Sequence, residues 1–338
     1  MFIGYLGVSM TKHCNVVLEG GGVKGIAHVG ALCALEKHDY VCDRIAGSSA
    51  GAIVGALLAA GYDGEEMHTI MQSLDYTKFR QKTQLDHIGS IGKLMQVIFA
   101  FGIYKAQYLE QWLHTLLEAK HVTCFKDVKN PDGTYRLQVT TSDISDQELL
   151  VLPQDLVKFH IDMDSFPIAE AVRMSMSIPF FYEPYKLKDE TGRIHYMVDG
   201  GMLSNYPIWI LDDGTSIPKH PTFGLKFTSD KQEDCQLPCM EGTNLIDYAK
   251  MILSTLLDAN DNMHISSSKG DFARSILLSS VITQGNKRKK ISTIDFDITK
   301  EESNALYNNG YDAAEHFLAT WDFSSWIKKY RKPHNISK

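Results

Sequence analysis

The sequence has no apolar stretch that approaches the roughly 20 residues a membrane-spanning helix requires. The longest run, residues 97–103, is far shorter, and it suits core packing and a lipid-contacting lid equally well. Residues 1–10 are apolar but carry no positive charge, and no small-residue cleavage site follows them. We therefore expect neither a transmembrane helix nor a signal peptide.

Cysteine is also scarce. The chain of 338 residues has six, at positions 14, 33, 42, 124, 235 and 239. Only Cys235 and Cys239 are close together, and no second pair stands at zinc-ligand spacing. This pattern excludes a disulfide-stabilised mini-protein and predicts reduced thiols in a cytoplasmic protein without a metal or a cofactor. Because 44% of residues are hydrophobic and 22% charged, the composition also excludes a disordered chain.

Positive charge is in deficit, with 34 Lys and Arg against 41 Asp and Glu and a formal net charge of −7. The deficit argues against a nucleic-acid-binding protein, which would normally be basic. The basic residues are unevenly spread, however. Residues 287–290 and 328–332 are two basic patches without an acidic side chain nearby in sequence. Solvated surface charge is the default interpretation of such runs, and peripheral contact with the anionic headgroups of a membrane is the alternative.

The first part of the chain alternates between expected strands and helices. Residues 14–19 are typical of a buried strand, and apolar residues from 26 to 35 mark one face of a helix. A second strand is expected at 43–46 and a fully buried helix at 52–60. This order with short connections predicts an α/β fold, with a central, mostly parallel sheet flanked by helices and a helical insertion or lid region.

Further elements are expected along the rest of the chain. The helices are expected near 108–117, 168–176, 244–258 and 302–318. The strands are expected near 136–142, 148–152, 194–198, 221–227, 275–281 and 291–297, with a polar loop at 229–243.

The second expected strand runs into the sequence Gly47-Ser-Ser49-Ala-Gly51, which fits the G-x-S-x-G pattern. A serine on a sharp strand-to-helix turn has a strained backbone and an exposed hydroxyl, and the small residues on either side let the turn close. The N-terminus of the following helix points its free N–H groups at the same place. The alternative without a catalytic role is a tight turn whose serine only caps the helix.

A glycine-rich loop, Gly20-Gly21-Gly22-Val-Lys24-Gly25, follows the first strand. Successive glycines let backbone N–H groups converge on an anion, such as the oxyanion formed when a serine attacks an ester. Lys24 adds positive potential or fixes the loop through hydrogen bonds. Gly20, Gly22 and Gly25 also satisfy the dinucleotide fingerprint G-x-G-x-x-G. That alternative needs an acidic residue at the end of the second strand, whereas Asp43 stands at the start of the expected strand, which ends in the serine turn instead.

A third motif, Asp199-Gly200-Gly201, closes the strand expected at 194–198. An aspartate at this position can project to the carboxyl edge of the sheet, where Ser49 also projects, and can act there as the general base for the serine. The alternative is a purely structural role, because the sequence Asp-Gly-Gly favours a tight turn on its own.

Together these motifs resemble the patatin-like phospholipase family, in order and in spacing, over about residues 14–210. The segment 171–179, which ends in Ile-Pro, and the stretch D-G-G-x-x-x-N-x-P from Asp199 to Pro207 support the resemblance. Lys24 stands where many family members have arginine. The resemblance implies a catalytic domain at 14–210 and a C-terminal extension at 211–338 that packs on the same domain.

The resemblance further implies a Ser–Asp dyad without a catalytic histidine. Ser49 would be the nucleophile and Asp199 the base, and the backbone N–H groups of Gly20, Gly21 and Gly22 would hold the oxyanion. The implied reaction is hydrolysis of a fatty-acyl ester of a phospholipid or another acyl-glycerol through an acyl-enzyme, without a metal. An acyltransferase with the same dyad and a phosphate- or nucleotide-binding module are the alternatives. Head-group preference, the choice of sn-1 or sn-2, the activator and the oligomeric state are not encoded in these motifs.

Overall fold

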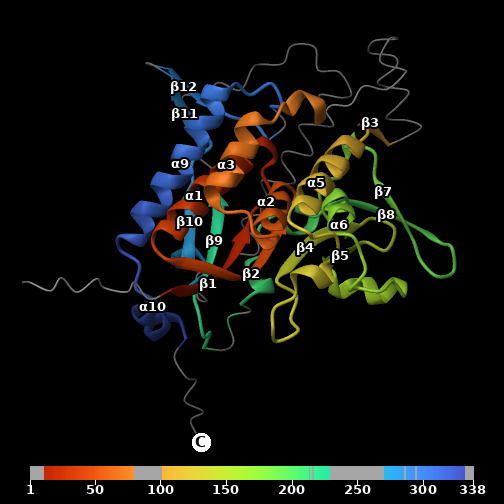
Figure 1. Ribbon diagram of the computed structural model, residues 1–338, viewed down its shortest axis with the longest axis horizontal. Helices are drawn as coiled ribbons and strands as arrows, with labels where there is room; N and C mark the ends of the chain where they lie inside the picture. The colour runs from red at the N-terminus through yellow and green to blue at the C-terminus, as the bar shows by residue number, and fades with distance from the viewer. Residues whose placement is uncertain are drawn as a thin grey trace, which may run out of the picture.

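The computed structural model describes residues 11–79, 101–212, 214, 217–228, 270–284, 287–293 and 295–331. The expected polar loop at 229–243, the expected helix at 244–258 and the pair Cys235 and Cys239 lie outside these ranges, as do residues 97–100 of the apolar run. Figure 1 shows the described elements in colour.

The centre of the molecule is a mixed sheet of eight strands in the order β10-β9-β1-β2-β4-β8-β7, with β5 paired to β4 (Figure 1). Neighbours from β10 to β4 run parallel, whereas β5, β7 and β8 are added antiparallel. Two small sheets pair β3 with β6 and β11 with β12. The strands are β1 (Lys12–Leu18), β2 (Tyr40–Ser48), β3 (Gly102–Tyr104), β4 (Leu137–Asp143), β5 (Glu148–Leu152), β6 (Phe180–Tyr182), β7 (Tyr185–Lys188), β8 (Ile194–Asp199), β9 (Thr222–Phe227), β10 (Ser275–Leu278), β11 (Val281–Gln284) and β12 (Lys287–Lys290).

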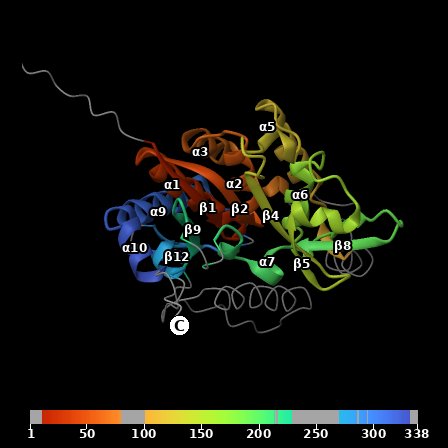
Figure 2. The same ribbon diagram turned by 90° about the horizontal axis from the view of Figure 1, so that it is seen from below.

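The helices are unevenly distributed over the two faces of this sheet. Figure 2 shows α1, α2, α3 and α5 above the strands and α7 below them. The larger hydrophobic core lies on the α1 and α2 side, while a small cluster of Val17, Ala46, Tyr206, Ile208 and Leu211 covers part of the other face. The α-helices are α1 (Ile26–Lys37), α2 (Ala50–Ala59), α3 (Gly64–Ser73), α5 (Gln107–Ala119), α6 (Ile168–Ser175), α7 (Gly201–Ser204), α9 (Lys300–Leu318) and α10 (Phe323–Tyr330). Short 3-10 turns are η1 (Gly22–Gly25), η2 (Tyr76–Phe79), η4 (Phe125–Val128), η5 (Gln154–Phe159), η6 (Ile208–Ile210) and η7 (Phe272–Arg274).

The expected start of the fold, strand–helix–strand–helix, is confirmed as β1-α1-β2-α2. Every residue of α2 is buried, because the helix consists entirely of apolar residues. The antiparallel pair β4 and β5 and the helices α5, α6 and α9 also lie where the periodicity predicts them.

Two glycines let α1 and α9 pack closely, although they are far apart in sequence. A methyl group at Gly30 would overlap the Tyr307 carbonyl, and one at Gly310 would overlap the Ala27 carbonyl. Close approach of the two backbones therefore depends on glycine on both helices.

The region after residue 211 adds strands to the same sheet, because β9 pairs with β1 and β10 with β9. Two expectations in this region are wrong. The single strand expected at 275–281 is divided between β10 and β11, and no described residue of 291–297 is in a strand. The strand nearby is instead the basic segment β12, which forms a hairpin with β11. The domain boundary at residue 210 stays a prediction.

The two basic patches lie at opposite ends of the molecule, β12 at the top and α10 at the bottom of Figure 1. Each is less basic than its sequence indicates. Lys289 pairs with Glu302 at 2.7 Å, and Arg331 is buried with its guanidinium 3.0 Å from the Asp212 carboxylate. Including Arg331 in a surface patch is therefore wrong. None of the described helices has the length and apolar composition needed to cross a bilayer.

Candidate active site

Three motifs that are far apart in sequence meet beside β1 and β2. The glycine-rich loop follows β1, Ser49 follows β2, and Asp199 is the last residue of β8. Strand β8 runs antiparallel to β4, and Asp199, its last residue, pairs with Thr141. The neighbouring Thr140 pairs with Ser48, the last residue of β2, so Asp199 lies level with the carboxyl end of β2. The expectation that Asp199 and Ser49 project to the same edge of the sheet therefore agrees with the structure, although β8 itself is antiparallel.

Ser49 occupies a strained turn between β2 and α2, with φ +52° and ψ −123°. Such a positive φ is unfavourable for a residue other than glycine and marks a functional constraint. A side chain at Gly47 would overlap the Gly51 carbonyl, and one at Gly51 would overlap the Leu18 carbonyl. The Ser49 N–H donates to Ser175 Oγ at 2.8 Å, which holds the turn from α6.

The Ser49 hydroxyl donates a hydrogen bond to Asp199 Oδ2 at 2.6 Å. The other carboxylate oxygen, Oδ1, accepts from the Gly201 N–H at 2.8 Å. Both side chains are buried, and burial raises the pKa of the Asp199 carboxyl to about 6, against the lowering effect of these two hydrogen bonds. A carboxylate with a pKa near neutrality is a better proton acceptor than an ordinary aspartate.

The glycine loop lies against this pair. The Gly20 N–H donates to the Asn205 carbonyl at 3.0 Å, and a side chain at Gly20 would overlap the Asn205 amide. The N–H groups of Gly21 and Gly22 donate to no residue in the described part of the chain. Gly22 has φ +56°, and a side chain there would overlap the Thr293 carbonyl.

The Lys24 ammonium lies 4.7 Å from the centre of the Phe227 ring. Gly25 approaches α2, because a side chain there would lie 3.1 Å from Ala50 Cβ. Gly200 approaches β4, because a side chain there would overlap the Thr140 carbonyl. These glycines therefore permit close packing around the site.

A buried ion pair at the base of the glycine loop was not anticipated from the motifs. Glu19 Oε1 and Lys226 Nζ are 2.9 Å apart, and Glu19 Oε2 accepts a hydrogen bond from the Phe227 N–H. Both side chains are buried, so the pair ties the end of β1 to β9 just before Gly20. Ser175 and Asn205 lie within the segments 171–179 and 199–207, but nothing in their spacing predicted their contacts with Ser49 and Gly20.

An apolar cavity of about 30 Å³ adjoins the serine. Met176 links the two, because its sulfur lies 3.4 Å from Ser49 Oγ and it also lines the cavity. The wall is formed mostly by aliphatic and aromatic side chains from α1, α2, α3, η2 and α5 and from the connections after α3 and before α9, namely Ile26, Ile53, Val54, Met71, Leu74, Tyr76, Phe79, Trp112 and Phe296.

One cluster in the described residues has the side chains of a metal site, namely Asp143, Asp146 and His195. The three side chains already bind one another, since His195 Nδ1 lies 2.8 Å from Asp143 Oδ2 and 3.3 Å from Asp146 Oδ2. His195 and Asp199 are four positions apart in β8, roughly 13 Å at about 3.3 Å per residue. The cluster is therefore separate from the serine site.

The dinucleotide-binding alternative is not supported by Asp43. This residue lies in the first half of β2 rather than at its end, and its carboxylate is 2.8 Å from His13 Nδ1. Strand β2 ends at Ser48, directly before the serine turn. His28, near the start of α1, is fully buried against Phe227, and burial followed by the positive charge of Lys24 lowers its pKa to about 3.

These features define an α/β protein with a serine–carboxylate site and a glycine loop beside it. The family model described as patatin-like phospholipase matches residues 16–212. The chain therefore belongs to the patatin-like phospholipase family, and it is a lipid ester hydrolase.

Two relatives match over almost their full length. Uncharacterized protein YqhO of Bacillus subtilis is 34% identical, covering 91% of this chain and 98% of that protein. Uncharacterized protein R571 of Acanthamoeba polyphaga mimivirus is 27% identical, covering 90% and 93%. Lysophospholipase NTE1 of Eremothecium gossypii is 28% identical over 57% of this chain but only 11% of its own length. The crystal structure of VipD from Legionella pneumophila has a TM-score of 0.48 at 18% identity, covering 92% of this chain and 67% of that one.

Proposed function

We propose that this protein is a phospholipase A-like acyl hydrolase in which Ser49 and Asp199 form a catalytic dyad. The observation that carries the proposal is the 2.6 Å hydrogen bond from Ser49 Oγ to a buried carboxylate whose pKa lies near neutrality. Histidine has no place in this dyad, because the Asp199 carboxylate occupies the position from which a base removes the hydroxyl proton.

In the first half of the reaction, Asp199 Oδ2 takes the proton from Ser49 Oγ while Oγ bonds to the ester carbonyl carbon. The tetrahedral intermediate then breaks its bond to the glycerol oxygen, which leaves with the proton from Asp199. In the second half, Asp199 takes a proton from water, the hydroxide bonds to the acyl carbon, and Ser49 leaves as the hydroxyl. The products are a fatty acid and a lysophospholipid.

The N–H groups of Gly21 and Gly22 are the proposed donors to the oxyanion. Gly20 belongs to the same loop, but its N–H is engaged by the Asn205 carbonyl, so we assign it a positioning role. Donors fixed in place before the reaction stabilise the charge that develops on the carbonyl oxygen, and each contributes about 3 kcal/mol in comparable sites.

The apolar cavity beside Met176 supports a fatty-acyl chain as the group transferred to Ser49. At about 30 Å³ it holds little more than one methylene group, so we propose that side chains such as Leu74 and Met71 move when a long chain enters. Glycerophospholipids are the proposed substrates.

The test is product analysis by mass spectrometry on mixed phospholipid vesicles. Ser49→Ala and Asp199→Asn should each reduce fatty-acid release by at least about 1,000-fold while thermal unfolding stays cooperative. A fluorophosphonate probe should label Ser49 of the wild type. The matched control is Ser48→Ala, which removes the neighbouring hydroxyl. Full activity in either dyad variant, or labelling of another residue, would refute the dyad.

An acyltransferase with the same dyad remains the second candidate, because an alcohol can replace water in the second half of the reaction. Adding glycerol or a lysophospholipid to the assay distinguishes the two. A hydrolase releases mainly free fatty acid, whereas a transferase moves most of the acyl groups to the added alcohol.

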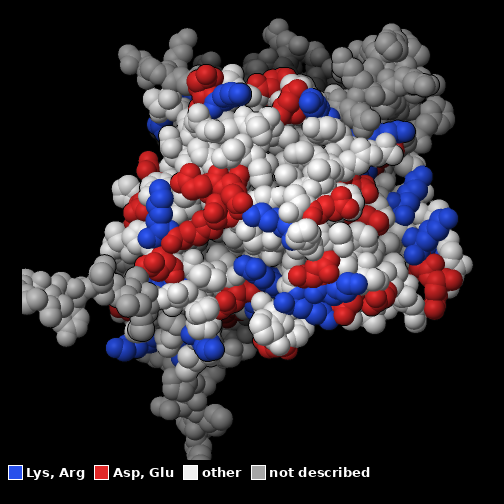
Figure 3. Space-filling model, viewed as in Figure 1, with Lys and Arg blue, Asp and Glu red and all other residues white. Residues whose placement is uncertain are grey.

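We also propose that the β11–β12 hairpin contacts anionic lipid near the site. The hairpin ends three residues before Thr293, whose carbonyl accepts from the Val23 N–H at 3.2 Å. Lys290 is exposed at the end of this hairpin. On the face shown in Figure 3, basic side chains gather below the middle of the view beside acidic ones, away from β12 at the top of Figure 1.

Vesicle sedimentation with and without phosphatidylglycerol tests this contact. Lys290→Gln should weaken binding to anionic vesicles about fivefold, since each basic residue near such a surface contributes about 1 kcal/mol. Lys328→Gln, on α10 at the opposite end, is the matched control. Equal losses in both variants would contradict a specific role for the hairpin.

A further inference from the structure

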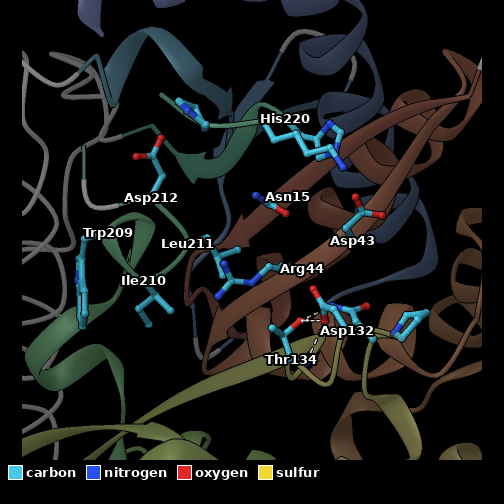
Figure 4. Close-up of a pocket in the computed structure, with 14 residues that line it drawn as sticks. Asn15, Asp43, Arg44, Asp132, Thr134, Trp209, Ile210, Leu211, Asp212 and His220 are labelled. Atoms are coloured by element: carbon cyan, nitrogen blue, oxygen red, sulfur yellow. Dashed lines mark hydrogen bonds between the residues drawn. The ribbon is translucent and has the colours of Figure 1, made fainter. Parts of the chain in front are cut away.

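A second pocket, of about 700 Å³, lies on the less covered face of the sheet, near the amino ends of β9 and β4 (Figure 4). Asn15 of β1 and Arg44 of β2 are paired in the sheet and form its floor. Arg44 and Ser49 are five positions apart along β2 and the turn after it, roughly 16 Å at about 3.3 Å per residue. The pocket is therefore separate from the serine site, and its volume is within the range of small-molecule sites.

The carboxylates around the pocket are already bound to other groups. Asp43 is 2.8 Å from His13 Nδ1, and Asp132 accepts from the Thr134 N–H at 2.9 Å and from its hydroxyl at 2.6 Å. Asp212 is buried between the guanidinium groups of Arg274 and Arg331.

The two basic side chains at this pocket have no such partners among the described residues. Arg44 is half-buried and makes neither a hydrogen bond nor an ion pair with the residues that the structure describes, and its Nε is buried without a partner. The hydrogen bonds from Thr134 are the main reason that the pKa of the Asp132 carboxyl is lowered, and the charge of Arg44 adds to this effect without ion-pair contact between the two groups. Figure 4 shows Arg44 in the middle of the pocket, between Asn15 and Thr134. Lys219 is exposed at the rim and also has no ion pair within the described ranges.

A half-buried guanidinium without a partner is costly, and its planar donors match a carboxylate or phosphate. The opposite wall is apolar, with Ile210, Leu211 and the half-exposed ring of Trp209. We propose that this pocket binds a small anionic ligand, whose phosphate or carboxylate contacts Arg44 and Lys219 and whose apolar part packs on Trp209.

Calorimetric titration with inorganic phosphate, glycerol 3-phosphate and acetate tests the proposal on the full chain. We expect saturable binding of at least one anion at concentrations up to about 10 mM, and a change in Trp209 fluorescence during the titration. Tighter binding of glycerol 3-phosphate than of phosphate would identify an organic phosphate as the ligand class, and equal binding would restrict recognition to the anion.

Arg44→Met should weaken binding about tenfold or more, because a hydrogen-bonded charge is lost. Since the half-buried guanidinium makes no contact of this kind in the described structure and is costly there, methionine should not lower the unfolding temperature. Lys219→Met should weaken binding less, because the lysine is at the rim. Lys188→Met, an exposed lysine of β7, is the matched control with the same charge change.

Two further variants separate this site from the proposed active site. Ser49→Ala should bind the anion as the wild type does, and Trp209→Phe should lose the fluorescence change while retaining calorimetric binding. The proposal is overturned by the absence of saturable binding for all three anions. It is equally overturned by equal weakening in Arg44→Met and Lys188→Met, which would indicate only a non-specific charge effect.

Discussion

The buried carboxylate of Asp199 should make the folded protein less stable as the pH rises. Its pKa is about 6 in the folded state, where burial is the main cause, and near 3.8 when the chain unfolds. The folded protein therefore binds the proton more tightly than the unfolded chain does. This stabilising effect is fully present below about pH 3.8 and is lost as the pH rises through 6.

The magnitude follows from the difference between the two pKa values. A difference of about two units corresponds to about 3 kcal/mol, most of it already lost at pH 7. Asp199→Asn removes the titration but preserves the hydrogen bonds, because the amide oxygen can accept from the Gly201 N–H and the amide N–H can donate to Ser49 Oγ. We therefore expect the variant to be more stable than the wild type at pH 7.5 by about 2–3 kcal/mol.

The assay is urea unfolding of the wild type and Asp199→Asn at pH 4.5 and pH 7.5. The gain in free energy of unfolding from the substitution should be larger at pH 7.5, because other titrating groups are common to both proteins and cancel in the difference. In parallel, kcat/KM of the wild type should fall as the pH drops through about 6, because the base becomes protonated. A pH-independent difference between the two proteins, together with an activity midpoint near 4, would refute a raised pKa.

Two further predictions concern packing around the site. Gly51→Ala should reduce the free energy of unfolding by about 2–3 kcal/mol in urea, because its methyl group overlaps the Leu18 carbonyl, whereas Gly133→Ala, in an open turn, should cost about 1 kcal/mol. Equal costs would argue against crowding at the elbow. Glu19→Gln should cost about 3 kcal/mol by leaving the Lys226 ammonium buried beside a neutral amide, and adding Lys226→Met should recover part of the loss. An additive double variant in the same assay would show that the two side chains are not coupled.

Local patterns were sufficient for much of the fold. The helices α1, α2 and α5 were predicted, because the spacing of apolar residues within a helix indicates which of its faces is buried. The serine turn was predicted for the same reason, since small residues at 47 and 51 and a strand–helix context act within a few positions. The strand at 291–297 was predicted wrongly, because a short apolar stretch beside a basic one does not reveal which of the two pairs in a hairpin.

The sequence by itself therefore determined the elements, the glycine loop, the serine turn and the Asp-Gly-Gly motif, and through them the family. Only the tertiary structure decided that β8 runs antiparallel, so that Asp199 meets Ser49 beside the middle of β4. It also decided that Asn205 engages the Gly20 N–H and that Arg331 is buried with Asp212. Strand direction and the choice of polar partners depend on residues that are 54 to 185 positions apart in these examples, and no local pattern encodes those contacts.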